Sequence, residues 1–378
     1  MNRPLARLAF PLLLAIAASA RAEDAGDAWP LHRGDPAQTA RAAGSLPDAP
    51  ELLWTFEVGS AIASSPVVAD GTVYFGADDA KLHAVRLEGG EERWAFETGD
   101  MIEAPPLVAA GRVYVGSSDG LFYAVDAATG RLAWKRETGA QILGSANRLE
   151  GEDGRLRIVV GSYDATLYCF DGETGETVWT YATEDRINGS PSVADGRIVI
   201  GGCDTNLHVV DGETGEAWKK IPMGDACHIA ASAGLDGGDA YFGHYGNEFV
   251  RLSLETGEVV WRHAHPTQAF FSPPAIGDDV VLFGGRDKRL HCVDRATGEE
   301  RWTHRARRNV DAGPVLCGDR VASAAGDGRV RIVRLADGEE VWSYDVGKPI
   351  LASPAIAGGR LLVGANDGNL YCFGAASR

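Results

Sequence analysis

The residues best suited to chemistry in this sequence stand in its middle third: Cys203, Cys227, His228, His244 and Tyr245. Thiolate and imidazole groups together suit zinc or copper. In an oxidising compartment, two cysteines on neighbouring loops would instead form a disulfide. The spacing of the cysteines and histidines matches no short metal-binding motif. The sequence therefore leaves three interpretations open: a Cys203–Cys227 disulfide, a metal site that adds His228 and His244, or no interaction.

Other polar residues recur with the repeats of the chain. His83, His208 and His291 occupy one strand position, and we expect them to be exposed or half-buried rather than ligands. Aspartates recur in turns, where they bond to their own backbone; the set is Asp119, Asp164, Asp204, Asp287 and Asp327. A set repeated around a ring cannot make one active site. No nucleophile elbow, phosphate-binding loop or His-Glu zinc helix occurs, so we expect no enzyme and assign no catalytic residue.

Tryptophan marks the repeat that must position these residues. The spacings between successive tryptophans are 40, 40, 45, 39, 43, 41 and 40 residues, a period typical of a propeller or solenoid. Identical placement in every unit predicts a structural role, in which each ring docks one blade on the next. The predicted docking residues are Trp54, Trp94, Trp134, Trp179, Trp218, Trp261, Trp302 and Trp342.

Each unit shows the pattern of four short strands. Glycine turns such as Thr129-Gly130 and Thr174-Gly175 precede the tryptophans, and alternating segments such as Leu121–Val125 precede the turns. Turn signals come about every ten residues, and helical periodicity is absent. The sequence therefore predicts an all-β fold, an eight-bladed β-propeller with four strands per blade.

The two ends of the repeat array predict how the ring closes. The last unit stops after its third strand, at Leu370 to Phe373, whereas Glu51 to Phe56 is a fourth strand with no unit before it. We expect the two to pair, because closure removes exposed strand edges. The chain then divides into a leader (1–22), a lead-in segment (23–50) and the propeller (51–378).

The register of the repeat predicts one face that could bind a ligand. The position four before each strand-opening residue is uniformly apolar, as at Ile62 and Ile102, and we expect it to pack between blades. Flanking positions alternate to the opposite face and line the mouth of the central channel. The candidate ligand face is Arg186, Asn188, His228, His244, Tyr245, Arg286, Asn309 and Asp311. Arg186, Arg286 and Asn309 would steer an anionic ligand.

The N-terminal residues predict export. Arg3 and Arg7 precede an apolar run, and Ala20-Arg21-Ala22 has the small-x-small pattern of a signal peptidase site, so we expect cleavage after Ala22. The apolar run is short for a membrane span. The first cysteine is Cys169, which indicates no lipoprotein attachment site. We expect a periplasmic or secreted protein without stable membrane insertion, and a monomer.

Charge excludes one class of partner. The formal net charge is −17, and a leader that holds three arginines and no acid leaves −20 after cleavage. Such a surface repels phosphate backbones, so nucleic acid is not an expected partner. Arg305 to Arg308 interrupts the acidic balance, and we interpret this run as a solvated strand end.

Two kinds of segment carry a family resemblance. Asp126–Gly130 through Trp134, and Asp171–Gly175 through Trp179, resemble the tryptophan-docking motif of quinoprotein propellers. Trp29–Asp35 resembles the opening segment of bacterial PQQ-binding-like repeat proteins. The resemblance covers almost all of the mature chain and implies the propeller fold named above.

The resemblance implies two functional classes. In quinoprotein dehydrogenases, pyrroloquinoline quinone (PQQ) and calcium lie above the channel, but this chain lacks their vicinal cysteine pair, their haem motif and their long loops. The BamB family of outer-membrane assembly propellers is similar in size, blade number and compartment. We therefore expect a protein-binding scaffold with an envelope partner and no cofactor. The alternative is a redox protein that uses PQQ, copper or zinc at the channel mouth.

Overall fold

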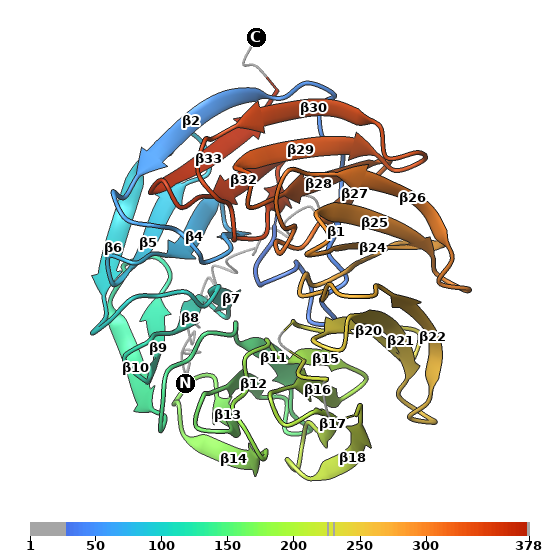
Figure 1. Ribbon diagram of the computed structural model, residues 1–378. Helices are drawn as coiled ribbons and strands as arrows, with labels where there is room; N and C mark the ends of the chain where they lie inside the picture. Colours follow the sequence, from blue (N-terminus) through green and yellow to red (C-terminus); the bar gives the residue numbers. More distant parts are fainter. Residues whose placement is uncertain (1–27, 225–226, 230, 376–378) are drawn as a thin grey trace, which may run out of the picture.

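The computed structural model describes residues 28–224, 227–229 and 231–375, which form a ring of eight β-sheets and contain no helix (Figure 1). The predicted leader and its cleavage site at Ala22 lie outside these residues. No segment of the described chain is a helix that could span a membrane. The all-β, eight-bladed propeller predicted from the tryptophan repeat is confirmed.

Blades are numbered in chain order, from the innermost strand outward. Blades 1 to 4 are β3 (Val67–Ala69), β4 (Thr72–Gly76), β5 (Lys81–Arg86), β6 (Glu92–Glu97); β7 (Leu107–Ala109), β8 (Arg112–Gly116), β9 (Leu121–Asp126), β10 (Leu132–Glu137); β11 (Asn147–Glu150), β12 (Leu156–Gly161), β13 (Thr166–Asp171), β14 (Thr177–Ala182); and β15 (Ser192–Ala194), β16 (Arg197–Gly201), β17 (Asn206–Asp211), β18 (Ala217–Pro222).

Blades 5 to 7 continue the pattern, and blade 8 takes its outer strand from the N-terminal side. They are β19 (Gly234–Asp236), β20 (Asp239–His244), β21 (Glu248–Ser253), β22 (Val259–Ala264); β23 (Ala275–Ile276), β24 (Val280–Gly284), β25 (Arg289–Asp294), β26 (Glu300–Arg305); β27 (Val315–Cys317), β28 (Arg320–Ala324), β29 (Arg329–Arg334), β30 (Glu340–Asp345); and β31 (Ala355–Ala357), β32 (Arg360–Gly364), β33 (Asn369–Gly374) with β2 (Glu51–Glu57).

Ring closure follows the predicted pairing. Strand β2 pairs antiparallel with β33, with Leu52 opposite Phe373 and Trp54 opposite Cys372. The two strands come from opposite ends of the chain and lie side by side in Figure 1. Blade 8 is thereby complete, and its β33 is no longer an edge open to pairing with another chain.

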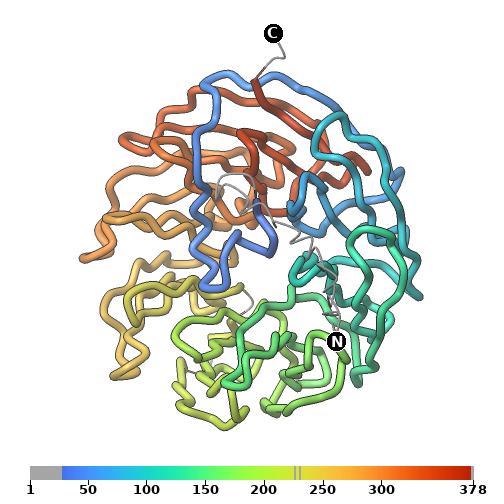
Figure 2. The backbone as a smooth tube through the Cα atoms, turned by 180° about the vertical axis from the view of Figure 1, so that it is seen from behind, coloured from blue at the N-terminus to red at the C-terminus, as the bar shows by residue number. Residues whose placement is uncertain are grey.

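The lead-in segment crosses the ring, which the sequence did not predict. Its carbonyl groups accept hydrogen bonds from the innermost strand of one blade after another, for example Trp29 from Val68 at 2.8 Å and Ala40 from Leu316 at 3.0 Å. The short strand β1 (Arg41–Ala42) then pairs with β27. Figure 2 shows this blue segment from behind, crossing the middle of the ring. The lead-in thus ties the inner strands together on the side away from the channel mouth.

Arg33 is the buried cation of the lead-in. Its side chain is 1% exposed, and its guanidinium donates hydrogen bonds to the Pro274 carbonyl at 2.7 Å and to the Pro314 carbonyl. Burial lowers the Arg33 pKa to about 9, opposed by the nearby Asp35 carboxylate. The guanidinium remains charged at neutral pH and links blades 6 and 7 through backbone carbonyls.

Six of the eight tryptophans dock as predicted. Each indole stands against the turn glycine of the next blade and donates its N–H to a carbonyl there, as Trp134 does to Gly172 at 3.1 Å. The other five are Trp54, Trp94, Trp179, Trp261 and Trp302, with N–H···O distances of 2.8–3.1 Å. Trp342 packs edge-on against Phe373 of blade 8, with ring centroids 5.2 Å apart.

Docking is wrong as a prediction for Trp218. Its ring is 38% exposed, and the turn glycine Gly257 approaches Lys219 and Ile221 instead. The Lys219 ammonium donates to the Leu254 carbonyl, which is the acceptor that a docked indole would use. Two cations lie near the Trp218 ring, with Arg197 3.5 Å and Lys219 4.7 Å from its ring centroid. The Lys219 ammonium therefore takes the acceptor that the Trp218 indole would use in a docked position.

A second repeated contact joins the inner parts of the blades. The apolar position four before each strand-opening residue is buried in every blade, with exposures of 0–1% for Ile62, Ile102, Ile142, Ile187, Ile229, Phe270, Val310 and Ile350. Most of these side chains pack directly on a glycine of the preceding blade. A Cβ added to Gly116 would lie 2.1 Å from Ile142. Glycine is required there because the next blade fills the space.

The repeated aspartates do more than form turns. One carboxylate oxygen accepts the backbone N–H two residues on, as predicted; Asp119 accepts that of Leu121 at 2.8 Å. The other oxygen accepts from a side chain four residues on. These donors are His83, Tyr123, Tyr168, His208, His291, Arg331 and Tyr371. The prediction of exposed or half-buried histidines at this position is wrong, because all three histidines are at most 5% exposed.

Candidate functional site

The channel mouth is built from two sets of loops that meet on one face. The loop between strands two and three of a blade donates a backbone hydrogen bond to the loop that enters that blade. Examples are Cys203 N–H to the Arg186 carbonyl at 3.1 Å and Tyr245 N–H to the His228 carbonyl at 3.1 Å. The predicted meeting of these loops is therefore observed, and it places side chains from neighbouring blades together.

The Cys203, Cys227, His228 and His244 group does not form the sites considered for it. All six cysteines are free thiols, so the Cys203–Cys227 disulfide is absent. Within the described chain, the group of three metal-ligating side chains that lie close together lies elsewhere and contains none of these four residues. His228 bonds through Nδ1 to the Cys203 carbonyl, and the Cys203 sulfur contacts Asn188 Nδ2 at 3.2 Å. Burial raises the pKa of both thiols, so neither is an activated nucleophile.

His244 lies beneath the mouth rather than on it. Its side chain is 1% exposed, and its Nδ1 accepts the Gly246 N–H at 3.0 Å. Glu248 Oε2 lies 3.7 Å from Nε2 and is itself paired with Arg262 at 3.2 Å. Burial, and to a smaller extent the Arg262 charge, lower the His244 pKa to about 4. The ring is neutral in the folded protein over the physiological range.

A pH dependence of stability follows from this buried ring. The unfolded chain protonates His244 near pH 6.5 whereas the folded chain resists protonation until about pH 4, so stability falls as the pH drops through that interval. Between pH 7.5 and pH 5 we expect His244 alone to remove about 2 kcal/mol from the free energy of unfolding. In His244→Ser, which copies Ser117 and Ser162 of other blades, urea unfolding at the two pH values should show correspondingly less loss. If His244→Ser lost as much free energy of unfolding between pH 7.5 and pH 5 as the wild type, this role of His244 would be contradicted.

Five predicted or neighbouring residues form a continuous strip across blades 5 to 7. The His228 ring meets Tyr245 edge-on at 5.9 Å, and Tyr245 lies against Phe271 with ring centroids 4.3 Å apart. The Arg286 guanidinium covers Phe271 at 4.1 Å and pairs with Asp311 at 3.3 Å. Tyr245 remains 49% exposed. Aromatic rings with an attached arginine are the residue types that dominate binding energy at protein interfaces.

Arg186 makes contacts other than those of the strip. It is exposed, covers the Tyr163 ring at 5.7 Å and lies 3.7 Å from Asp185. The predicted face therefore has two sets of contacts: Arg186 with Tyr163, and the strip from His228 to Asp311. Asn188 is half-buried, and its side-chain oxygen has no hydrogen-bond partner.

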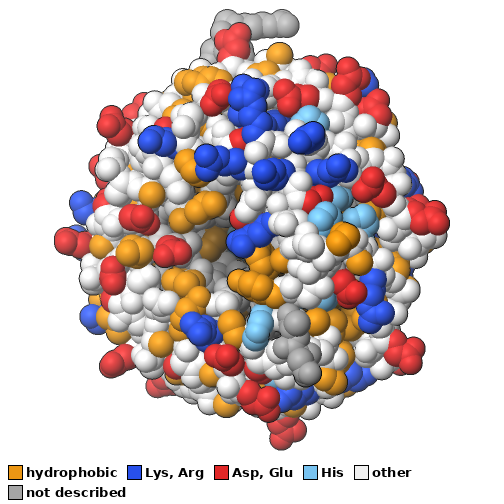
Figure 3. Space-filling view, in the orientation of Figure 1, with side chains coloured by type: hydrophobic (Ala, Val, Ile, Leu, Met, Phe, Trp, Pro, Cys, Tyr) orange, Lys and Arg blue, Asp and Glu red, His pale blue; other side chains and the backbone are white. Residues whose placement is uncertain are grey.

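Sequence reasoning missed a basic hollow beside the strip. A hollow of about 550 Å³ is lined by Lys288, Arg307, Arg308, Asn309, Asp311, Gly326, Pro349 and Leu351. Arg307 and Arg308 are exposed, as expected for a solvated strand end, but they face this hollow together with Lys288 of the preceding loop. Figure 3 shows basic side chains gathered on one side of the central depression, with hydrophobic side chains around it. The feature of the sequence that could have indicated this hollow is the run from Arg305 to Arg308.

The mouth residues do not fit a quinone with a calcium ion. Calcium takes six to eight oxygen ligands, mostly carboxylates. Two acids near the mouth are the exposed Asp78 and the half-buried Glu103. Partial burial raises the pKa of each; the Asp79 charge raises that of Asp78 further, and the Asp78 charge raises that of Glu103. Among the described residues, these acids do not belong to a group of three possible metal ligands close enough to share one ion. The donor set offered is therefore too small for this ion, and no catalytic step is derived through a quinone.

Comparison with known proteins gives one family and a set of similar folds. The family model described as outer membrane protein assembly factor BamB matches residues 46–152, 144–284 and 246–377. Among curated proteins, no sequence match is found.

Solved structures with this fold include BamB and dehydrogenases. BamB from Moraxella catarrhalis has a TM-score of 0.73 at 19% identity, with 87% of this chain and 99% of that chain covered. Quinohemoprotein alcohol dehydrogenase from Comamonas testosteroni has a TM-score of 0.79 at 16% identity, covering 94% and 82%. A europium-containing methanol dehydrogenase has 0.78 at 13%, covering 93% and 98%. At these identities the likeness shows the fold alone.

Proposed function

Because this chain belongs to the outer membrane protein assembly factor BamB family, we propose that it is a non-catalytic periplasmic propeller that binds a segment of an envelope protein across its channel mouth. The observation that carries the proposal is the strip Tyr245–Phe271–Arg286 beside the basic hollow. Export rests on the predicted signal peptide.

Charge complementarity specifies the partner segment. The chain carries a formal net charge of −17, yet Lys288, Arg307 and Arg308 line one hollow at the mouth. An acidic segment would be repelled by most of the surface and attracted to this place, which favours one orientation of docking. Exposed Tyr245 and Leu351 offer apolar contacts beside the charges. The segment that fits is therefore acidic with one or more large apolar side chains.

Site-specific photocrosslinking in the periplasm tests the proposal. A photoreactive residue at Tyr245 or Leu351, which are 49% and 48% exposed, should crosslink to an envelope protein. The matched control is Leu132 on the outer strand β10, which is 44% exposed and distant from the mouth in sequence and blade. Equal crosslinking at Leu132 would contradict a mouth interface.

Charge reversal supplies the second measurement. Arg308→Glu should weaken binding of the crosslinked partner about tenfold at low salt and less at high salt, because an exposed charge acts over a screened distance. Lys135→Glu on the outer rim is the control. A quinone absorbance that survives dialysis of the purified chain would overturn the scaffold proposal in favour of redox chemistry.

A further inference from the structure

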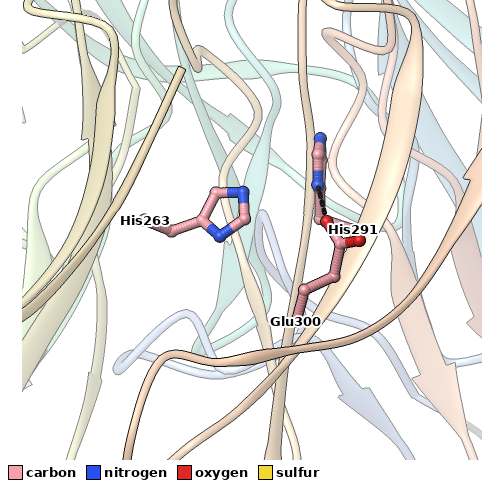
Figure 4. A group of neighbouring side chains, drawn as sticks. All are labelled: His263, His291 and Glu300. Atoms are coloured by element: carbon pink, nitrogen blue, oxygen red, sulfur yellow. Dashed lines mark ion pairs between the residues drawn. The ribbon is translucent and has the colours of Figure 1, made fainter. Parts of the chain in front are cut away.

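Three metal-ligating side chains, none of them part of the channel-mouth strip, meet at the interface of blades 5 and 6. His263 is on β22, His291 on β25 and Glu300 on β26, and one ligand atom of each lies within 4.8 Å of the others. Figure 4 shows the His263 ring facing the edge between the two blades, with Glu300 reaching His291. His291 is buried, His263 half-buried and Glu300 exposed, so the group opens to solvent on one side.

His291 presents an unsatisfied nitrogen to this group. Its Nε2 lies 3.1 Å from the Asp287 carboxylate, which holds the proton on Nε2. Nδ1 is then a lone-pair acceptor; it is buried without a hydrogen-bond partner and lies 3.5 Å from Glu300 Oε2. With the proton on Nε2, two acceptors face each other, an arrangement that favours a cation between them. A carboxylate on the far nitrogen is also the usual support of a metal-binding histidine.

The repeat supplies internal comparisons, because the same three positions recur at other blade interfaces. Between blades 6 and 7 the positions hold His304, Arg331 and Glu340, and the Arg331 guanidinium lies 3.5 Å from the Glu340 carboxylate. At that interface the Arg331 guanidinium is the cation beside the carboxylate. A cation is therefore what this arrangement of positions accommodates.

Two further interfaces lack the full ligand set. Between blades 4 and 3 the Tyr181 hydroxyl meets Nδ1 of His208 at 2.8 Å and satisfies it. Between blades 8 and 1 the first position is Phe56, which leaves His83 and Glu92 as the only two ligands. In these comparisons, only the blade 5–6 interface combines two imidazoles with a carboxylate and lacks a protein donor.

His263 lies beside His291 across the blade interface. Its ring centroid lies 5.0 Å from that of His291, at an interplanar angle of 63°.

We propose that His263, His291 and Glu300 bind a divalent first-row transition metal, with Zn²⁺ the best match to two imidazoles and one carboxylate. Ligand atoms around Zn²⁺ lie about 2.1 Å from the ion and so about 3.4 Å apart. The 3.5 Å between His291 Nδ1 and Glu300 Oε2 already has this value. The His263 ligand atom lies within 4.8 Å of the other two, so a shift of at most about 1.4 Å brings it to the ligand spacing of about 3.4 Å. Water completes the coordination on the open side, and the ion links blade 5 to blade 6.

Titration of the mature, tag-free chain with Zn²⁺ by calorimetry tests the proposal, with Co²⁺ absorbance as a second probe. We expect one site. His263→Phe, which copies Phe56, and Glu300→Gln should each weaken it at least tenfold. His291→Tyr, which copies Tyr123 and keeps a donor for Asp287, should abolish it. Saturating Zn²⁺ should raise the thermal midpoint of the wild type by about 3 °C and that of His263→Phe by less.

A matched control separates this site from other histidines. His83→Tyr alters the equivalent position in blade 1 and should leave the Zn²⁺ affinity unchanged. Wild-type affinity in both His263→Phe and Glu300→Gln, each at a partly or fully exposed position, would overturn the site. So would the absence of any Zn²⁺ binding at 100-fold molar excess.

Discussion

Replacing Trp134 with alanine is expected to lower the free energy of unfolding by about 3–5 kcal/mol, as for a large aromatic removed from a packed interior. The indole is 8% exposed, stands against Gly175 of the next blade and donates to the Gly172 carbonyl at 3.1 Å. Alanine leaves a cavity between blades 2 and 3 and removes that hydrogen bond. Chemical unfolding followed by circular dichroism measures the change.

Trp218→Ala is the matched control for this loss. The Trp218 ring is 38% exposed and does not stand against a turn glycine. Its removal costs part of an exposed contact with Arg197 and Lys219, which we expect to be about 1 kcal/mol. Equal losses for Trp134→Ala and Trp218→Ala would contradict a stabilising contribution from burial and docking of Trp134 against the next blade.

Gly116→Val should destabilise the inner interface of blades 2 and 3 by about 3 kcal/mol or more. A Cβ at this position would lie 2.1 Å from Ile142 Cγ2 and 2.5 Å from its Cβ. Both positions are buried, so the β-branched side chain must separate the blades or distort the strand. We expect a lower urea midpoint with preserved strand content.

Two further variants assign the loss to this contact. Gly111→Ala replaces a glycine at φ +73° with nothing within 4 Å of the added carbon, so it measures backbone strain alone, about 1 kcal/mol. Ile142→Ala in the Gly116→Val background should recover part of the stability by making room. No recovery would contradict direct packing of the two side chains. Ala324 stands at the equivalent position of blade 7, which indicates that one methyl group can be accommodated there.

The candidate site could be predicted only in part. The loops that meet at the mouth follow from the repeat register, and Tyr245, Arg286 and Asp311 do share one strip. His244 was expected on the same face but is buried, because alternation fixes the face of a strand residue and not the depth of the loop above it. The basic hollow was missed because Lys288 and Arg307 come from successive loops, and only folding brings them together.

The sequence by itself determined the architecture. Blade number, strand order and ring closure depend on local patterns: a tryptophan near every fortieth residue, a glycine turn before it, and unpaired strands at the two ends. Such patterns act through neighbouring residues and are repeated eight times, so a departure such as Trp218 does not change the fold.

Only the tertiary structure decided which singular residues meet. The path of the lead-in across the inner strands and the Arg197 guanidinium over Trp218 join residues distant in sequence, and the His263–His291–Glu300 group arises where two blades touch. His263 and His291 belong to different repeats, and their separation along the chain matches no ligand motif. Contacts between blades depend on the three-dimensional packing of side chains. The repeat pattern determines which positions meet, but it does not determine which residue types stand at those positions.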